Sequence, residues 1–171
     1  MKIDLDAKTL PDDLLLDANA TGQQTLSLTA NPLVQLVFAA NRYARSAARY
    51  YQKDFGLSVM DWRLLVMLTR EPNIPVGRAC EVMGIDKAAV SRTLAHLERL
   101  GLAVSKTPDV HARRRLWRLT PEGAQLHDRV LETALDRQHQ HLRGFTAEEV
   151  RHFVGYLHRI IDNFDRANSA D

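Results

Sequence analysis

Apolar residues recur at three- and four-residue steps along most of this chain, the spacing that places them on one face of an α-helix. The first long stretch starts after Asn31-Pro32 and extends to about Phe55. Asparagine suits an N-cap and proline suits the first helical position, so this pair predicts where the helix begins. Because its apolar positions cover more than one face, the helix needs more than one partner, and a second subunit would supply the other.

A second helix is predicted at about residues 59–68, preceded by Ser58 and Asp61 at the spacing of a capping box. Apart from Asp61, Arg63 is the only charged residue in this apolar stretch. An unpaired buried guanidinium is costly. The Arg63 side chain must therefore reach solvent, form an internal ion pair, or bind the carboxylate of a ligand.

The centre of the chain, residues 75–100, has the pattern of a helix-turn-helix, with two ordinary surface helices as the alternative. Gly84 marks the turn, and Asp86 suits the N-cap of a second helix that ends near Gly101. The second helix has one apolar stripe, formed by Val90, Leu94 and Leu97. Its opposite face is small, polar or basic and carries Lys87, Ala88, Ser91, Arg92, Ala95, His96 and Arg99.

A β-hairpin is predicted directly after the helix-turn-helix, with strands at 102–106 and 115–119. Its loop leads into Arg113, Arg114 and Arg115. A run of charge is more often a solvated face, but this one follows a helix with a small, polar exposed side. Such a helix fits a DNA major groove, and a cationic loop beside it reaches phosphates or the minor groove. The two elements together favour DNA binding.

Two further helices are predicted after the hairpin. Thr120 and Pro121 begin a helix that extends to about Leu142, and the last helix follows a capping box of Thr146 and Glu149. A broad apolar face on the last helix suits an element shared between two subunits. Its members are Val150, Phe153, Val154, Leu157, Ile160, Ile161 and Phe164.

The weakest pattern belongs to the first 31 residues. Residues 10–20 predict a short helix, and residues 21–30 predict a polar linker. A disordered tail and a helix that packs on a dimer are both left open.

Charge is distributed unevenly, although its net value is only +2. Residues 78–118 carry nine basic and four acidic side chains, whereas residues 119–171 carry six basic and nine acidic ones. Positive charge is therefore concentrated on the predicted helix-turn-helix and hairpin, as attraction to phosphate requires.

Length and composition narrow the class further. A chain of 171 residues, 45% of them hydrophobic, fits one domain or one lobe with a dimerisation arm. It has no long apolar run and no signal-peptide pattern, so we expect a cytoplasmic protein without a membrane partner. The single cysteine, Cys80, excludes an intrachain disulfide and argues against a thiolate zinc site. Its place beside the helix-turn-helix turn favours packing over a redox switch.

No enzyme motif is found: the chain lacks a phosphate-binding glycine loop, a Gly-x-Ser-x-Gly sequence and a His-Glu-x-x-His sequence. The histidine pairs 139/141 and 152/158 are poorly spaced for chelation from one helix. We therefore expect no catalytic residues, no metal site and no cofactor.

Residues from about 32 to 165 resemble the MarR family of winged-helix transcription regulators. The matching stretches are LSVMDWRLLVML, the helix-turn-helix, LERLGLAVSK and RRRLWRLTPEGAQL. The resemblance implies a mainly α fold with a small β-wing, in which N- and C-terminal dimerisation helices flank a winged helix-turn-helix. One departure concerns the family's Asp-x-Arg wing motif, because Arg113 matches its arginine but His111 stands at the aspartate position. Asp109 is the alternative aspartate.

Four parts follow from the pattern and the resemblance together. We expect an N-terminal extension at 1–31, a dimerisation helix at 32–56, a winged helix-turn-helix DNA-binding lobe at 57–119, and C-terminal dimerisation helices at 120–171. The resemblance also implies a ligand pocket between the dimer interface and the DNA-binding lobes.

The expected function is a homodimeric repressor released from a pseudo-palindromic operator by a small aromatic acid, of phenolic or pyridine carboxylate type. The residues expected to contact DNA are Lys87, Ala88, Ser91, Arg92, His96, Lys106, Arg113, Arg114 and Arg115. The residues expected to bind the effector are Asn41, Tyr43, Trp62 and Arg63. Three alternatives stay open: a metal- or oxidant-responsive regulator, a ligand-blind architectural DNA-binding protein, and a winged helix that binds only proteins.

Overall fold

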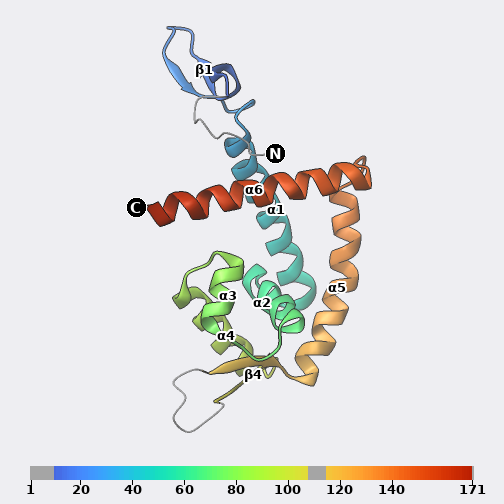
Figure 1. Ribbon diagram of the computed structural model, residues 1–171. Helices are drawn as coiled ribbons and strands as arrows, with labels where there is room; N and C mark the ends of the chain where they lie inside the picture. The colour runs from blue at the N-terminus through green and yellow to red at the C-terminus, as the bar shows by residue number, and fades with distance from the viewer. Residues whose placement is uncertain (1–9, 108–114, 171) are drawn as a thin grey trace. The chain divides into compact units, whose positions relative to one another are not determined.

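The computed structural model of the chain describes residues 10–107 and 115–170. The described residues up to His127 form one compact unit, and those from Asp128 form a second. In chain order the first unit contains η1 (Asp12–Leu14), β1 (Leu16–Ala18), β2 (Gln24–Leu26), α1 (Pro32–Phe55), α2 (Val59–Arg70), β3 (Ile74–Pro75), α3 (Val76–Met83), α4 (Lys87–Arg99), β4 (Ala103–Lys106) and β5 (Leu116–Leu119) (Figure 1). Helix α5 (Pro121–His141) starts in the first unit and continues into the second, which also holds α6 (Ala147–Ala170).

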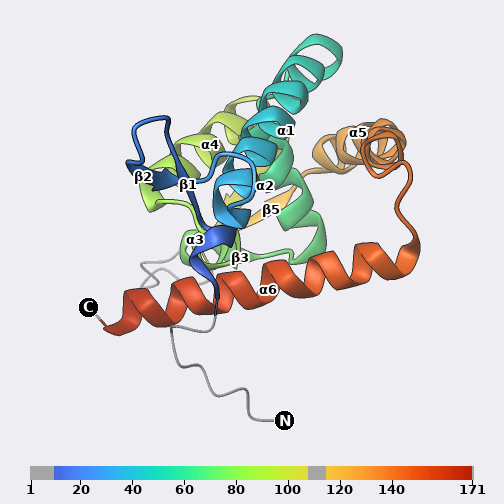
Figure 2. The ribbon, with the colours of Figure 1, turned by 90° about the horizontal axis from the view of Figure 1, so that it is seen from above.

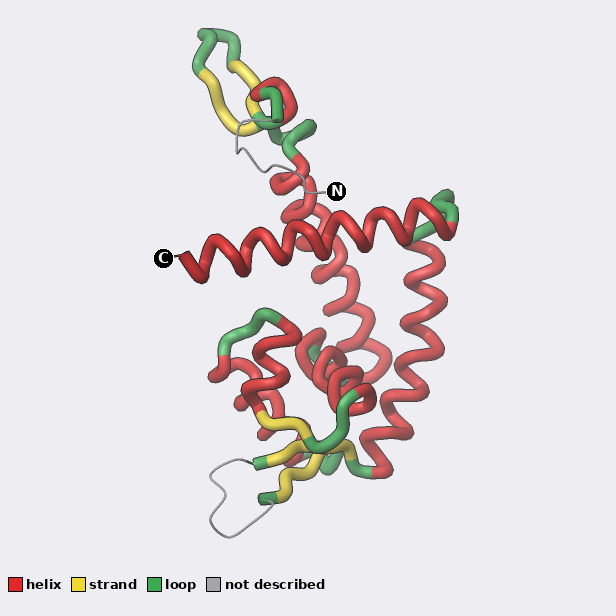
Figure 3. The backbone as a smooth tube through the Cα atoms, viewed as in Figure 1, coloured by secondary structure: helices red, strands yellow, loops and turns green. Residues whose placement is uncertain are grey.

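Helices dominate the described residues, and the sheet of the helix-turn-helix region is small (Figure 3). It has the strand order β3-β5-β4, with both pairings antiparallel. Strands β4 and β5 form the predicted hairpin, in which Ala103 pairs with Leu119 and Lys106 with Leu116. The predicted fold, mainly α with a small β-wing, is confirmed.

The start and end of α1 follow from its capping residues. The Asn31 side-chain oxygen accepts hydrogen bonds from the backbone N–H groups of Leu33 at 3.0 Å and Val34 at 3.2 Å. Gly56 ends the helix at a φ of 68°, a conformation that glycine adopts without a Cβ penalty. The predicted boundaries of this helix are confirmed.

The capping box of α2 is also present. The Ser58 hydroxyl accepts from the Asp61 N–H at 3.1 Å, and the Asp61 carboxylate accepts from the Ser58 N–H at 2.8 Å. The helix contributes Leu64, Leu65 and Leu68 to the core, where each is at most 2% exposed. Helix α2 is therefore the internal support against which α4 and β5 pack.

The helix-turn-helix has the predicted turn and cap. Gly84 has a φ of 62° at the end of α3, and the Asp86 carboxylate accepts from the Ala89 N–H at 2.9 Å at the start of α4. The apolar stripe of α4 is buried, with Val90, Leu94 and Leu97 at most 1% exposed. The opposite face of α4 is thereby directed away from the core.

The Thr120–Gly123 segment anchors the start of α5 to the end of the helix-turn-helix. The Thr120 hydroxyl donates to the Gly101 carbonyl and accepts from the Gly123 N–H at 3.0 Å, and the Thr120 N–H donates to the Leu102 carbonyl at 3.1 Å. A Cβ at Gly123 would lie 1.9 Å from that carbonyl oxygen. The two backbones approach so closely that only glycine fits.

The structure corrects the expectation for residues 10–20, where the predicted short helix is wrong. Only the 3-10 turn η1 forms, and β1 then pairs with β2 in a hairpin that aligns Leu16 with Leu26. The Asn19 side chain closes the connecting turn by accepting from the Thr21 and Gln23 N–H groups, both at 3.0 Å. Asparagine commonly closes a turn in this way, which favours a hairpin over a helix here.

Helix α6 is one continuous helix (Figure 2). It begins at the predicted capping box, in which the Glu149 carboxylate accepts from the Thr146 N–H at 2.7 Å. This hydrogen bond lowers the pKa of the Glu149 carboxyl. Large apolar side chains of α6 are about half exposed, among them Phe153, Val154, Ile161 and Phe164.

Candidate nucleic-acid interface and effector pocket

Helix α4 directs a small, basic face to solvent. Lys87, Ala88 and Arg92 are exposed, as are Ala95 and Arg99. Two other predicted DNA contacts, Ser91 and His96, are half-buried on the flanks of this face. The face carries two arginines and a lysine without an acidic residue, so it can meet a phosphate backbone or base edges.

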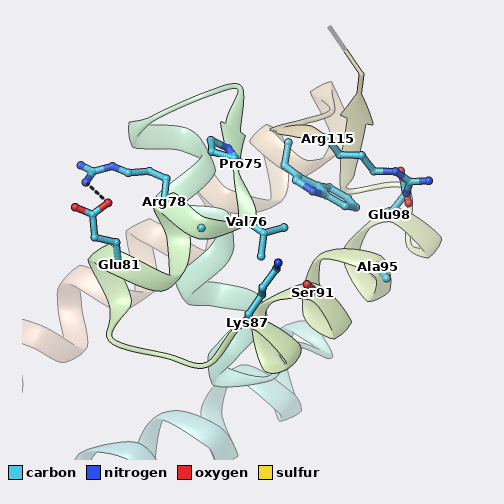
Figure 4. Close-up of a pocket in the computed structure, with 11 residues that line it drawn as sticks. Pro75, Val76, Arg78, Glu81, Lys87, Ser91, Ala95, Glu98 and Arg115 are labelled. Carbon is cyan, nitrogen blue, oxygen red and sulfur yellow. Dashed lines mark ion pairs between the residues drawn. The ribbon is translucent and has the colours of Figure 1, made fainter. Parts of the chain in front are cut away.

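A groove of about 710 Å³ lies between α3, α4 and the base of the wing. Figure 4 shows Lys87, Ser91 and Ala95 in a row along α4, with the Lys87 side chain directed toward Val76 of α3. Arg115 lines the groove from the wing side. The structure thus brings the N-terminal half of α4 and a wing arginine to one surface.

The wing contributes further cations besides Arg115. Lys106 is exposed at the end of β4 and pairs with Leu116, the residue next to Arg115. Lys106 and Arg115 therefore lie at the end of the hairpin next to the loop, whereas Arg118 pairs with Val104 farther from it. The other predicted wing contacts, Arg113 and Arg114, lie outside the described residues. The two candidate positions for the aspartate of the wing motif, Asp109 and His111, also lie outside them.

Glu98 connects α4 to the wing, which the sequence did not indicate. Its carboxylate accepts from the Ser105 hydroxyl at 2.9 Å and from the Ser105 N–H at 3.4 Å. Ser105 belongs to β4, so this contact fixes the base of the wing against the recognition helix. The wing cations and the α4 face are consequently held on one support.

Arg78 of α3 forms the main ion pair of this surface, another feature missed from sequence. Its guanidinium donates to both carboxylate oxygens of Glu71, at 2.8 and 3.0 Å, and lies 3.3 Å from a Glu81 oxygen. The hydrogen bond from Arg78 lowers the pKa of Glu71, and the Glu71 carboxylate raises the pKa of Arg78. Because two carboxylates neutralise it, Arg78 adds less to phosphate attraction than an unpaired arginine would.

A second pocket, of about 420 Å³, brings together three of the four predicted effector residues, Tyr43, Trp62 and Arg63. Asn41 does not line it, because residues two positions apart on a helix point about 200° apart. The sequence did not single out the remaining lining residues, which are Tyr51, Val59, Val66, Met67, Arg70, Val82 and Met83.

Aromatic rings hold the indole of Trp62 in place at this pocket. The His127 ring stacks on it at a centroid distance of 5.4 Å, and the Tyr51 ring lies 5.7 Å from it. Arg63 is exposed, and no ion pair of Arg63 is found among the described residues. This excludes a buried ion pair of Arg63 among the described residues. The Arg63 guanidinium is open to solvent and to a ligand.

Comparison with known proteins bears on this architecture. Residues 55–115, which contain α2, the helix-turn-helix and the first wing strand β4, match the model of the MarR family. Over this region the chain is similar to the MarR family.

Individual MarR-type proteins resemble the chain at modest identity. YybA, an uncharacterized HTH-type transcriptional regulator of Bacillus subtilis (strain 168), is 26% identical over 116 residues, which cover 67% of this chain and 76% of the relative. The MarR/EmrR family regulator of Acinetobacter sp. ADP1 superposes with a TM-score of 0.77 at 24% identity, over 82% of this chain and 99% of that one.

PcaV of Streptomyces coelicolor, solved with its natural ligand, has a TM-score of 0.68 at 22% identity, over 81% of this chain and 96% of that one. At these identities the two solved structures show that the fold is shared. They do not by themselves assign a ligand or a DNA sequence.

Among residues 10–107 and 115–170, no three histidine, cysteine or acidic side chains group to hold a metal ion. Cys80 is half-buried, and its carbonyl accepts from the Ile85 N–H at 3.3 Å in the helix-turn-helix turn. In the same part of the chain, none of the helices is both long and apolar enough to span a lipid bilayer.

Proposed function

We propose that this protein is a MarR-type homodimeric repressor that binds a pseudo-palindromic operator and is released from it by a small aromatic acid. Helix α4 of each subunit enters a major groove, and the two helices lie roughly 34 Å apart, about one turn of DNA. Residues 57–119 bind DNA in this proposal, and residues 32–56 and 120–171 form the dimer.

The basic, small-residue face of α4 is the observation that carries the proposal. Lys87 and Ala88 in its first turn reach base edges because a recognition helix contacts bases through its N-terminal residues. Arg92 has the length to make a bidentate contact with guanine, and Ser91 and His96 flank it. On the wing, Lys106, Arg114 and Arg115 contact phosphates, and Arg113 enters the minor groove.

The apolar face of α6 supports a dimer. An amphipathic helix needs a partner for its apolar side, and Ile161 remains 52% exposed in the single chain. A face that meets its own copy about a two-fold axis gives a closed dimer. Two matched DNA-binding lobes then read two halves of an inverted repeat.

Replacing Arg92 with alanine tests the DNA-binding face. We expect operator affinity to fall by about 1–3 kcal/mol, because a bidentate base contact is lost, and base preference to relax at one position of each half-site. Fluorescence anisotropy with a selected operator measures both effects. Arg45→Ala, at an exposed position on α1, is the control and should bind like wild type.

If Arg92→Ala and wild type bound every operator variant with equal affinity, Arg92 would not contact bases and the proposed role of α4 in base recognition would be wrong. A loss that also appears in Arg45→Ala would show that only the total positive charge matters.

The effector pocket supplies the release mechanism. Trp62 and Tyr43 offer aromatic surfaces, and Arg63 offers a guanidinium that pairs with a carboxylate in bidentate geometry. Arg70, on the same helix, gives the pocket a second cation. A neighbour of the same fold, PcaV, is known with a natural ligand bound.

Such a ligand acts by stabilising a spacing of the two DNA-binding lobes that no longer fits successive grooves. A preference of ~2–3 kcal/mol for that spacing weakens DNA binding roughly 30- to 150-fold.

Arg63→Ala tests the ligand assignment. The variant should fold and bind operator like wild type, because the guanidinium is exposed, but lose the thermal stabilisation that benzoate-type acids give wild type. The measurement is a thermal-shift screen of small aromatic acids, repeated with operator present, with Arg45→Ala as control. An unchanged response of Arg63→Ala to the active acids would show that their carboxylate is bound elsewhere.

A further inference from the structure

The described N-terminal residues, 10–31, form an arm that hydrogen bonds attach to the start of α1. The Ser27 N–H donates to the Leu15 carbonyl at 2.8 Å, and the Ser27 hydroxyl accepts from the Ala30 N–H at 2.9 Å. The Asn31 side chain donates to the same Leu15 carbonyl at 3.3 Å while its oxygen caps α1. One asparagine therefore links the hairpin to the helix, and the hairpin lies at the N-terminal end of α1 (Figure 1).

The arm buries a polar side chain and exposes several leucines. Ser27 is fully buried, whereas its neighbours Leu26 and Leu28 are 55% and 60% exposed. Leu10 and Leu14 are exposed as well. A two-stranded hairpin is marginal in water unless something packs on it, and this one directs leucines outward. We expect another surface to cover them.

The apolar surface continues from the arm onto α1. The Gln35 side chain donates to the Leu28 carbonyl, so this part of the arm lies against the first turns of α1. Leu33 and Val37 on those turns are also exposed. The N-terminal end of α1 belongs to the part proposed above as the dimer interface, so the arm extends that interface.

Charge distinguishes between possible partners. Residues 10–31 contain three aspartates and no lysine or arginine. DNA and anionic lipid would be repelled by this arm. Residues 32–55 contain four basic side chains and one acidic side chain, so a second copy of this chain offers a surface of opposite sign.

From these observations we propose that the arm packs on the partner subunit of the dimer, with Leu26 and Leu28 as its main contacts. The arm then forms an intersubunit contact that slows dissociation of the dimer. This inference rests on the proposed dimer but not on the identity of the operator or the effector.

The first test compares leucine substitutions of equal exposure. Leu26→Gln combined with Leu28→Gln should raise the dimer dissociation constant at least tenfold and speed subunit exchange between fluorescently labelled dimers. Leu100→Gln, at a position 50% exposed at the end of α4, should change neither. Sedimentation velocity and energy transfer between labelled subunits give the two readouts, and circular dichroism confirms that each variant is folded.

The second test locates the arm directly. Cys80→Ser provides a cysteine-free background in which Leu26→Cys carries a benzophenone photocrosslinker. Irradiation should give a covalent product of two chains, whereas the same label at Leu100→Cys should not. Cross-linking that stays within one chain would overturn the proposal, as would a dimer indifferent to Leu26→Gln/Leu28→Gln.

The outcomes separate this inference from the proposed function. A wild-type protein that is monomeric removes the dimer itself and the arm's role with it. If the wild type is a dimer that binds operator and the arm variants do not affect it, only the proposed intersubunit contact of the arm is wrong.

Discussion

Replacing Ile161 with glutamate is expected to convert the protein to a monomer and to weaken its binding to an operator with two half-sites by at least about 100-fold. Ile161 lies on the apolar face of α6 and is 52% exposed in the single chain. In the proposed dimer this face is covered, so a carboxylate there would be buried without a partner at a cost of several kcal/mol. Because the side chain is exposed in the monomer, the variant should still fold.

Gly155→Glu is the matched control for this experiment. Gly155 lies on the opposite side of α6, and a Cβ there would meet nothing within 4 Å. The control adds the same charge to the same helix, so it should stay dimeric and bind operator like wild type. Analytical ultracentrifugation and anisotropy measure both properties. A dimeric Ile161→Glu with full affinity would place the subunit interface elsewhere.

Gly123→Ala is expected to lower the free energy of unfolding by about 3 kcal/mol, at the upper end of the range for an overpacked site. The new Cβ would lie 1.9 Å from the Leu102 carbonyl oxygen, and a backbone atom cannot move aside as a flexible side chain can. The change therefore separates the first turn of α5 from the end of the helix-turn-helix and strains the bonds that Thr120 makes there.

The same substitution at Gly155 tests whether the clash is the cause. Gly155→Ala enters open space within α6, so helix propensity alone should stabilise it, by about 0.5–1 kcal/mol. Urea denaturation of the two variants gives changes of opposite sign if the geometry at Gly123 is correct. Equal effects at the two glycines would show that the close approach to Leu102 is absent in solution.

Helix boundaries were predictable because local chemistry determines them. Asn31, Ser58 and Asp86 cap their helices through side-chain oxygens that reach backbone N–H groups only two or three residues away. Gly56 and Gly84 end helices with positive φ values. These interactions depend on adjacent residues, so the sequence reveals them before any tertiary contact is known.

The N-terminal hairpin was not predictable in the same way. Its strands have only three residues each, and their alternation is too short to distinguish from a helical pattern. Its form depends on Asn19, Ser27 and Asn31 side chains bonding to backbone groups. Such hydrogen bonds form only after the chain has folded back on itself. The pattern of hydrophobic residues therefore does not indicate them.

The candidate DNA surface was only partly predictable. The α4 positions followed from its buried stripe, because exposure on a helix is fixed by the residues opposite. The Glu98–Ser105 and Arg78–Glu71 contacts join residues seven positions apart in different elements, so they depend on how α4 meets the wing and how α3 meets the preceding loop. Arg70 was missed as an effector-pocket residue although it follows Arg63 by about two turns of α2, a spacing that places both on one face of the helix.

Selection of duplexes from a random pool, followed by determination of the subunit-to-duplex ratio, tests the central claim most directly. The account predicts enrichment of an inverted repeat whose half-sites are centred about 10 base pairs apart, bound by two subunits with affinity that falls steeply as salt rises. Failure to enrich any sequence, or binding of one subunit to a single half-site with a flat salt dependence, would contradict it.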